Sequence, residues 1–207
     1  QGYATALFGK WHIGMSFLDK EGQRITKDGV DGVQLIDYSR GIPDSPIHRG
    51  FDHFFGTVCC PATDFLYAFI DGDRIPVPPT KLLDKSKLPK HPYANDNRLG
   101  MIAPDFDLEE LDLVFLRKSR EFLESHRKQT PENPFFLYLA FGACHFPLHA
   151  PADDIRRHRG RYDEGWDVIR QQRFERQQEL GIIPDGTSLS PRNANVPAWS
   201  NLSKQQK

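Results

Sequence analysis

The stretch that decides the fold is Asn133 to Pro151, which reads Asn-Pro-Phe-Phe-Leu-Tyr-Leu-Ala-Phe-Gly-Ala-Cys-His-Phe-Pro-Leu-His-Ala-Pro. The seven residues from Phe135 to Phe141 are apolar or aromatic without alternation. A continuous apolar run of this kind is typical of a strand covered on both faces, whereas a strand with one wet face alternates. We therefore predict a buried parallel strand here.

The chain breaks directly after this strand, at Gly142, and then presents His145 and His149. Pro147 and Pro151 prevent regular structure in this segment. In open α/β sheets, ligands bind just beyond the carboxyl ends of the strands, so His145 is the first candidate site residue. The spacing of the two histidines would suit zinc on a helix, but Pro147 excludes a helical turn, and we assign no metal ligand from it.

An amphipathic helix is predicted upstream of this strand. Asp107 occupies the cap position and Glu110 follows it as in a capping box. The helix is expected to end near Arg127 and Lys128, whose charges suit a helix C-terminus. Its apolar stripe consists of Leu108, Leu111, Phe115 and Phe122. Helix, short loop and buried strand together predict an α/β layer architecture.

A second strand is predicted within Gly2 to Gly14, where a short apolar run ends at Gly9. Lys10 and His12 follow, at the same kind of strand end as the first histidine, and we expect the two stretches to share a site. The alternative is a surface lysine and a histidine that is hydrogen-bonded in a turn. Residues Met15 to Asp37 are polar and rich in glycine, and we interpret them as surface loop or short hairpins.

Four other segments carry structural predictions. Gly50 to Gly56 concentrates aromatic residues and is interpreted as core packing. Leu66 to Val77 predicts a β-hairpin turning at Asp71-Gly72. Pro78 to Pro104 is a long irregular excursion that would border a substrate cleft. Tyr162 to Leu180 predicts an outer helix.

The composition limits the classes of partner. A net charge of −1 over 207 residues supplies no global field for nucleic acid, and we interpret the basic segment Arg156 to Arg161 as solvated surface. No apolar run reaches the roughly 20 residues that span a bilayer. We therefore expect no nucleic-acid partner and no integral membrane segment. The chain begins at Gln1 without a leader, and we expect an internal fragment of one domain.

Four stretches resemble the sulfatase family. Gly2 to Gly14 closely resembles the second signature of the family, and Pro134 to Pro151 resembles its strand and histidine segment. Gly50 to Gly56 is similar to the aromatic stretch between them, and Tyr162 to Lys207 is most similar to bacterial-type arylsulfatases. The resemblance implies an alkaline-phosphatase-like mixed sheet flanked by helices. That fold would be incomplete here, with residues 1–207 as an internal part of a single catalytic domain.

The resemblance also implies hydrolysis of a sulfate ester. In the family, a cysteine or serine converted to formylglycine supplies the attacking hydroxyl, and a calcium ion holds the sulfate. Matched by motif, Lys10 would neutralise a sulfate oxygen and His12 would hydrogen-bond the formylglycine hydroxyls. His145 would contact the sulfate and protonate the leaving oxygen. The implied partner is a small sulfate ester or a sulfated glycan, and the family suggests a periplasmic, secreted or lysosomal location.

The sequence departs from the family pattern at the nucleophile and at the metal. The family's Cys/Ser-x-Pro-x-Arg motif is expected outside this chain, upstream of Lys10. Cys59 to Thr63 imitates that motif, but Thr63 stands where arginine is required, and we interpret the match as accidental. Asp153 and Asp154 do not match the calcium ligands, which are also expected outside the chain. These 207 residues alone are therefore expected to be inactive.

Two alternatives stay open. A phosphatase or phosphodiesterase of the same superfold would use a serine or threonine nucleophile and a two-metal site. A noncatalytic remnant would keep Lys10, His12 and His145 as an anion-binding cradle without a nucleophile. The sequence indicates neither the identity of the substrate nor the oligomeric state.

Overall fold

The computed structural model describes residues 2–60, 63–88, 97–146, 148 and 150–207. The chain divides into two compact units, Gln1–Ala150 and Pro151–Lys207, and each is described by itself. His149 and Pro147, which figure in the sequence analysis, lie outside the described residues.

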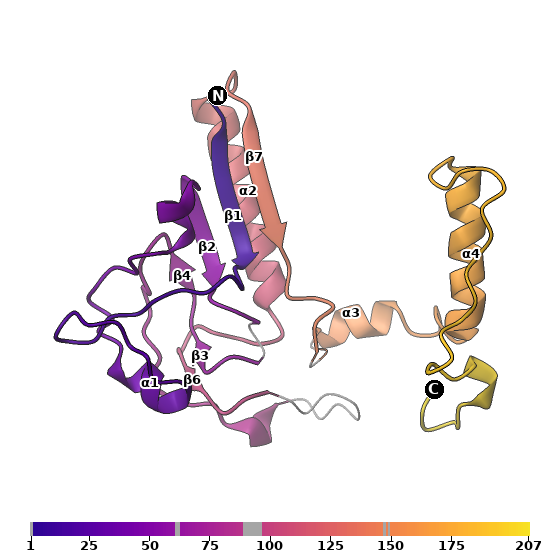
Figure 1. The fold of residues 1–207 in the computed structure, drawn as a ribbon, viewed down its shortest axis with the longest axis horizontal. Helices are drawn as coiled ribbons and strands as arrows, with labels where there is room; N and C mark the ends of the chain where they lie inside the picture. Colours follow the sequence, from indigo (N-terminus) through magenta and orange to yellow (C-terminus); the bar gives the residue numbers. More distant parts are fainter. Residues whose placement is uncertain (1, 61–62, 89–96, 147, 149) are drawn as a thin grey trace. The chain divides into compact units, whose positions relative to one another are not determined.

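A four-stranded mixed sheet organises the first unit (Figure 1). Strand β1 (Ala4–Lys10) lies at its centre, parallel to β2 (His53–Thr57) on one side and to β7 (Phe135–Ala140) on the other. Strand β4 (Ile70–Asp71) pairs antiparallel with β2 and completes the order β4-β2-β1-β7. The parallel strands predicted near Gly9 and Phe135 are confirmed.

Near the carboxyl ends of the three parallel strands, two glycines leave no room for a side chain. A Cβ atom at Gly9 would lie 1.9 Å from the carbonyl oxygen of Ala140, and a Cβ at Gly56 would lie 1.8 Å from the carbonyl oxygen of Gly9. Gly9 also has a φ of +116°, which L side chains rarely adopt. These positions therefore require glycine, and this requirement explains why the apolar run of β1 ends there.

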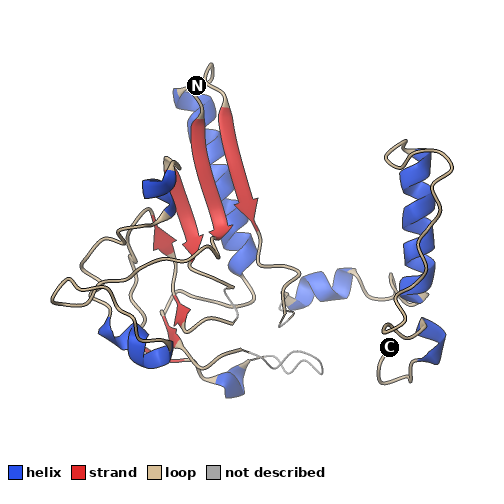
Figure 2. Cartoon of the chain, in the orientation of Figure 1, coloured by secondary structure: helices blue, strands red, loops and turns tan. Residues whose placement is uncertain are grey.

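Helix α2 (Leu111–Gln129) packs against β1, β2 and β7, as the helix beside the strands in Figure 2 shows. Phe115 is fully buried, and the ring of Phe122 lies 5.9 Å from that of Phe8. The predicted helix is confirmed, but its start is wrong. Asp107 accepts a hydrogen bond from the amide of Glu109 in a turn that precedes the helix, and the observed cap is Glu110, three residues later than expected.

Strand β7 is not covered on both faces, as its apolar run predicted. Phe136 and Tyr138 keep 54% and 48% of their surface exposed. β7 is the last strand in the sheet order, and the described residues cover it mainly through its pairing with β1 and its contacts with α2. A continuous apolar run indicates that both faces suit burial, but it does not supply the second covering layer.

A three-stranded second sheet follows the order β3-β6-β5. Strands β3 (Leu66–Tyr67) and β6 (Met101–Ile102) are parallel, and β5 (Lys81–Leu82) pairs antiparallel with β6. The predicted hairpin is therefore wrong in its pairing, because β3 joins β6 across the chain while β4 joins the main sheet. Its turn is confirmed by an antiparallel bridge between Asp71 and Arg74.

Several shorter helices complete the first unit. Helix α1 (Gly29–Leu35) lies in a segment that was interpreted as loop, and Val33 buries its side chain in the core. Two 3-10 turns follow, η1 (Pro46–Arg49) and η2 (Lys85–Lys87). The glycine-rich sequence concealed α1 because Gly29 and Gly32 weaken its helix propensity.

The second unit contains α3 (Ala152–Arg157), α4 (Gly165–Glu179) and the 3-10 turn η3 (Trp199–Asn201). The predicted outer helix is confirmed as α4. The indole rings of Trp166 and Trp199 meet edge to face, with 5.0 Å between their centroids. Among the helices of the described residues, none combines the length and apolarity needed to cross a membrane.

Candidate anion-binding active site

The site residues follow three parallel strands that end at one edge of the sheet. In the register of the sheet, Lys10 lies opposite Thr57 and Gly9 lies opposite Ala140. Beyond the strands, the amide of Trp11 donates to the carbonyl of Thr57 at 3.0 Å and the amide of His12 donates to the carbonyl of Val58 at 2.9 Å. The segments after β1, β2 and β7 therefore leave the sheet side by side, where α/β folds bind ligands.

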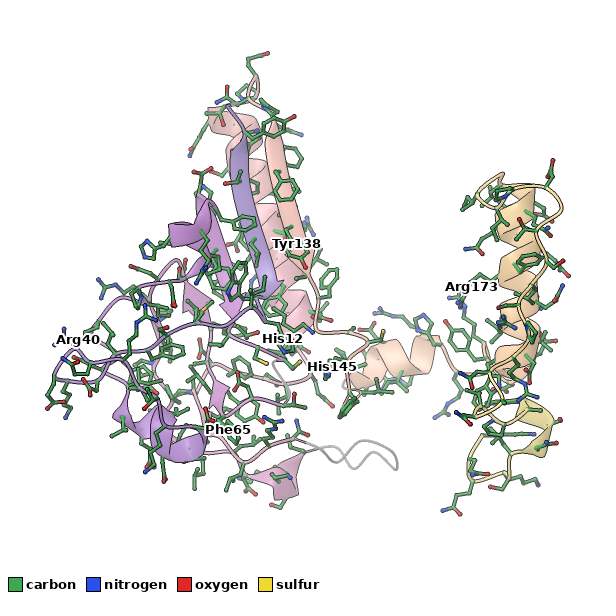
Figure 3. All side chains as sticks on the ribbon, viewed as in Figure 1. His12, Arg40, Phe65, Tyr138, His145 and Arg173 are labelled. Atoms are coloured by element: carbon green, nitrogen blue, oxygen red, sulfur yellow. The ribbon has the colours of Figure 1, made fainter. Side chains whose placement is uncertain are left out.

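The thiol of Cys60 is the point on which the predicted site residues converge. Its Sγ atom lies 3.4 Å from Nδ1 of His12 and 3.2 Å from Nε2 of His145. Nζ of Lys10 lies 3.8 Å from the same sulfur. His12 and His145 are labelled close together in Figure 3. The structure brings the two stretches together, and we call Lys10, His12, Cys60 and His145 the cradle. That they form one functional site stays a prediction.

His12 adopts an uncommon backbone conformation. Its φ is +58°, and it is the non-glycine residue with a positive φ in the part of the chain that the structure describes. A left-handed conformation of this kind costs a non-glycine residue about 1–2 kcal/mol. The hydrogen bond from the amide of His12 to the carbonyl of Val58 helps to hold this conformation. Strained residues of this kind gather at functional sites.

The loop after β7 fixes His145. Its amide donates to the carbonyl of Gly142 at 3.0 Å, and its Nδ1 lies 2.6 Å from the carbonyl oxygen of Phe146. Because a carbonyl can only accept, Nδ1 carries the hydrogen, and the neutral ring leaves Nε2 unprotonated toward Cys60. Asp112, in the first turn of α2, accepts from the amides of Gly142 at 2.7 Å and Ala143 at 2.9 Å.

Cys60 is the cradle residue that the sequence did not reveal. Its side chain is 3% exposed, and it was assigned to an accidental motif match because the residue pattern around it lacks arginine. The available signal was positional, because Gly50 to Gly56 contains most of a third parallel strand, β2, whose last residue, Thr57, lies opposite Lys10. A motif search compares residues that are adjacent in sequence. It therefore does not detect a cysteine that reaches the site through the pairing of β1 with β2.

Two acidic groups next to the cradle have raised pKa values. Burial raises the pKa of the Cys59 thiol above its usual range. Burial also raises the pKa of Asp64, although the amide of Phe65 donates to its carboxylate at 2.7 Å and opposes the shift. Both groups therefore favour their neutral forms more than exposed groups would.

The ligand atoms gathered at the cradle are sulfur and nitrogen. Within the described ranges, one ligand atom from each of His12, Cys59 and Cys60 lies within 4.8 Å of the other two. Calcium prefers six to eight oxygen ligands, so this set does not fit calcium. That calcium ligands lie elsewhere in the protein stays a prediction.

A separate pocket lies away from the cradle. It has a volume of about 660 Å³, and residues lining it include Tyr3, His53 and Phe122. These residues belong to the amino-terminal ends of the parallel strands and to α2, and none of the cradle residues lines the pocket. We assign the site to the cradle because titratable groups converge there at the carboxyl ends of the strands.

Comparison with known proteins identifies relatives of the chain. It is 28% identical over 209 residues to an uncharacterized sulfatase of Schizosaccharomyces pombe and 28% identical over 205 residues to an arylsulfatase of Klebsiella aerogenes. These matches cover 100% and 99% of this chain, but only 30% and 35% of the relatives, so the chain spans about a third of their length. An N-acetylgalactosamine-6-sulfatase of Sus scrofa is 24% identical over 171 residues, which cover 79% of this chain and 24% of that protein.

One solved structure, determined in work on glycosaminoglycan metabolism by Bacteroides thetaiotaomicron, matches 77% of this chain and 34% of its own with 21% identity and a TM-score of 0.49. The model of the family described as Sulfatase matches residues 1–193. The mixed sheet with its flanking helix agrees with the expected alkaline-phosphatase-like α/β fold. Because the family match spans well over half of the sequence, the chain belongs to the sulfatase family.

Proposed function

We propose that this chain forms part of an enzyme of the arylsulfatase type that hydrolyses sulfate monoesters. The observation that carries the proposal is the convergence of Lys10, His12 and His145 on one sulfur atom, at 3.8, 3.4 and 3.2 Å. Because all three groups contact the same buried thiol, they lie close enough together to contact different oxygens of one small tetrahedral anion bound beside it. One ammonium and two imidazoles are suitable donors for that anion.

The charges and protons of the cradle suit ester cleavage. Lys10 presents a compact positive charge to a sulfate oxygen, and negative charge develops on the leaving oxygen as the ester bond breaks. His145 would protonate that leaving oxygen. Its Nδ1 hydrogen is held by the carbonyl of Phe146, so the proton that it can transfer is the one on Nε2 of the protonated ring. After transfer, the neutral tautomer is the one that this hydrogen bond favours.

His12 would hydrogen-bond the attacking hydroxyl. Its position at the end of β1 places its Nδ1 on the same sulfur atom that His145 contacts. A formylglycine would supply the attacking hydroxyl, and we propose that it and the calcium ligands lie outside these 207 residues. The substrate class is a small aryl sulfate or a sulfated glycan, in keeping with the names of the arylsulfatase and N-acetylgalactosamine-6-sulfatase relatives.

The test is turnover of an aryl sulfate by the complete protein that contains this chain. Lys10→Ala is expected to lower kcat/KM by about 10²–10³, the usual loss when one group that stabilises a developing charge is removed. Lys20→Ala is the matched control, because Lys20 is an exposed lysine in a turn. Unchanged turnover in Lys10→Ala would refute the proposed role of the cradle.

The same assay separates the alternatives. The proposal predicts faster turnover of an aryl sulfate than of the matching aryl phosphate. Faster turnover of the phosphate would instead identify a phosphatase of the same superfold. If neither ester is hydrolysed but inorganic sulfate binds in a Lys10-dependent manner, the protein is a noncatalytic anion-binding remnant.

A further inference from the structure

Three side chains that can bind a metal ion lie close together at the cradle. Among the residues with described positions, His12, Cys59 and Cys60 each offer one ligand atom within 4.8 Å of the others. Both cysteines are free thiols. Thiolate sulfur and imidazole nitrogen are the ligands that thiophilic ions such as zinc prefer. We propose that His12, Cys59 and Cys60 bind one thiophilic divalent ion of the zinc class.

The distances agree with a zinc site. A tetrahedral zinc ion with Zn–S near 2.3 Å and Zn–N near 2.0 Å separates a sulfur and a nitrogen ligand by about 3.6 Å. Sγ of Cys60 and Nδ1 of His12 are 3.4 Å apart, so an ion can bind both with small side-chain movements. Nε2 of His145 lies 3.2 Å from the same sulfur, but His145 is not among the mutually close ligand atoms, so the three-residue set carries the site.

The backbone after β2 explains how two neighbouring cysteines reach one ion. In an extended strand, adjacent side chains point to opposite faces, and a Cys-Cys pair could not share a ligand. Here the chain bends at Val58 and Cys59. The hydroxyl of Thr57 donates to the carbonyl of Cys59 at 2.9 Å, and the amide of His12 donates to Val58. The bend brings both sulfurs to the same histidine.

Charge balance favours a divalent ion. Each thiol loses its proton when it binds, so one ion bound by Cys59 and Cys60 releases up to two protons to solvent. Two thiolates neutralise the charge of the ion. Lys10, whose Nζ lies 3.8 Å from the sulfur of Cys60, then faces a neutral complex rather than a second cation.

Metal binding has a consequence for the proposed reaction. The ion would bind Nδ1 of His12 and Sγ of Cys60, which belong to the cradle proposed for the sulfate ester. The ion and a sulfate ester would therefore exclude each other. Zinc is therefore expected to inhibit turnover by raising KM, and a zinc chelator is expected to restore it. This consequence rests on the proposed function, whereas metal binding itself does not.

The experiment is a cobalt titration of the complete, reduced protein, because Co²⁺ reports thiolate ligands by charge-transfer absorption and tetrahedral geometry by its visible bands. The unsubstituted protein should show both signals, and added Zn²⁺ should abolish them. Cys59→Ser and Cys60→Ser should each lose the charge-transfer signal that the site contributes. Cys144→Ser is the matched control, because Cys144 is an exposed thiol outside the ligand group, and it should retain the signal.

A fourth variant guards against misfolding of the buried cysteine variants. His12 is exposed and has a positive φ that asparagine tolerates, so His12→Asn removes a ligand without disturbing the core. It should weaken cobalt binding at least tenfold. Cobalt signals that are absent from the unsubstituted protein, or unchanged in Cys60→Ser and His12→Asn, would overturn the site. Zinc binding without inhibition would support the site and overturn the shared cradle, and with it the proposed role of His12.

Discussion

The thiol of Cys60 lies 3.2 Å from Nε2 of His145, although 85 residues separate the two along the chain. Cys60 follows β2 and His145 follows β7, and β1 lies between these strands in the sheet. The contact therefore crosses the end of the central strand, where Lys10 and His12 leave the sheet. We call this sulfur atom a spacer, because the two imidazoles and the ammonium all contact it and it sets the distances between them.

This spacer role predicts how substitution of Cys60 affects turnover of an aryl sulfate by the complete protein. Cys60→Ala should lower kcat about tenfold, because it removes the atom that both histidines contact. Cys60→Ser should restore part of the loss, because a hydroxyl still hydrogen-bonds an imidazole. Cys144→Ser, on the same loop as His145, should have kinetics close to those of the unsubstituted protein. Equal losses in Cys60→Ala and Cys60→Ser would contradict the role of a polar spacer.

Asp112 is predicted to position His145 without touching the substrate. Asp112→Asn leaves one acceptor oxygen for two amides, so either the half-buried amide of Gly142 or the exposed amide of Ala143 loses its partner. We expect a loss of about 1–3 kcal/mol in the free energy of unfolding and a fall in kcat larger than any change in KM. Asp105→Asn, at an exposed carboxylate before α2, is the control. If kcat of Asp112→Asn matches that of the control, the loop does not depend on this carboxylate.

Gly9 is predicted to be required by two separate effects that a matched variant distinguishes. Gly9→Ala combines an unfavourable φ of +116° with a Cβ atom 1.9 Å from the carbonyl oxygen of Ala140. Gly50→Ala combines a similar φ of +103° with open space. Urea denaturation should show a loss of about 1–2 kcal/mol for Gly50→Ala and above about 4 kcal/mol for Gly9→Ala. Equal losses would show that the sheet relaxes around the added methyl group.

Asp52 is predicted to stabilise the fold in a pH-dependent manner. Hydrogen bonds from the amide and hydroxyl of Thr5, at 2.8 and 2.9 Å, lower the pKa of its carboxyl group. A lowered folded-state pKa adds stability above the unfolded pKa of about 3.9, and this stability is lost as the pH falls through the folded-state value. Asp52→Asn should therefore cost about 1 kcal/mol at pH 7, a modest value because the group is exposed.

The pH dependence of that cost is the diagnostic result. Chemical denaturation of Asp52→Asn and the unsubstituted protein should give free energies of unfolding that converge as the pH falls through the lowered folded-state pKa of Asp52. Glu132→Gln, in the exposed loop before β7, should show no such convergence. A difference for Asp52→Asn that stays constant from pH 7 to acid would show that its effect is not electrostatic.

The sequence predicted elements that depend on short-range pattern. The apolar run ending at Gly9 and the run from Phe135 indicated strands because an uninterrupted apolar segment bounded by glycine fits a buried or central strand. The stripe containing Phe115 indicated α2 because helical spacing places such residues on one face. Resemblance of the stretch around Lys10 and His12 to a sulfatase signature identified the family that the comparisons confirm.

Tertiary structure decided what depends on partners distant in sequence. The pairing of β3 with β6 and the exposure of β7 follow from which segments meet, and local pattern does not encode that information. The same reason explains Cys60. The sequence by itself identified Lys10, His12 and His145 as candidate site residues, because residue type and position after an apolar strand can both be read from the local sequence. Only the order of the parallel strands placed the buried thiol among them, because a contact across 85 residues exists only once the sheet has formed.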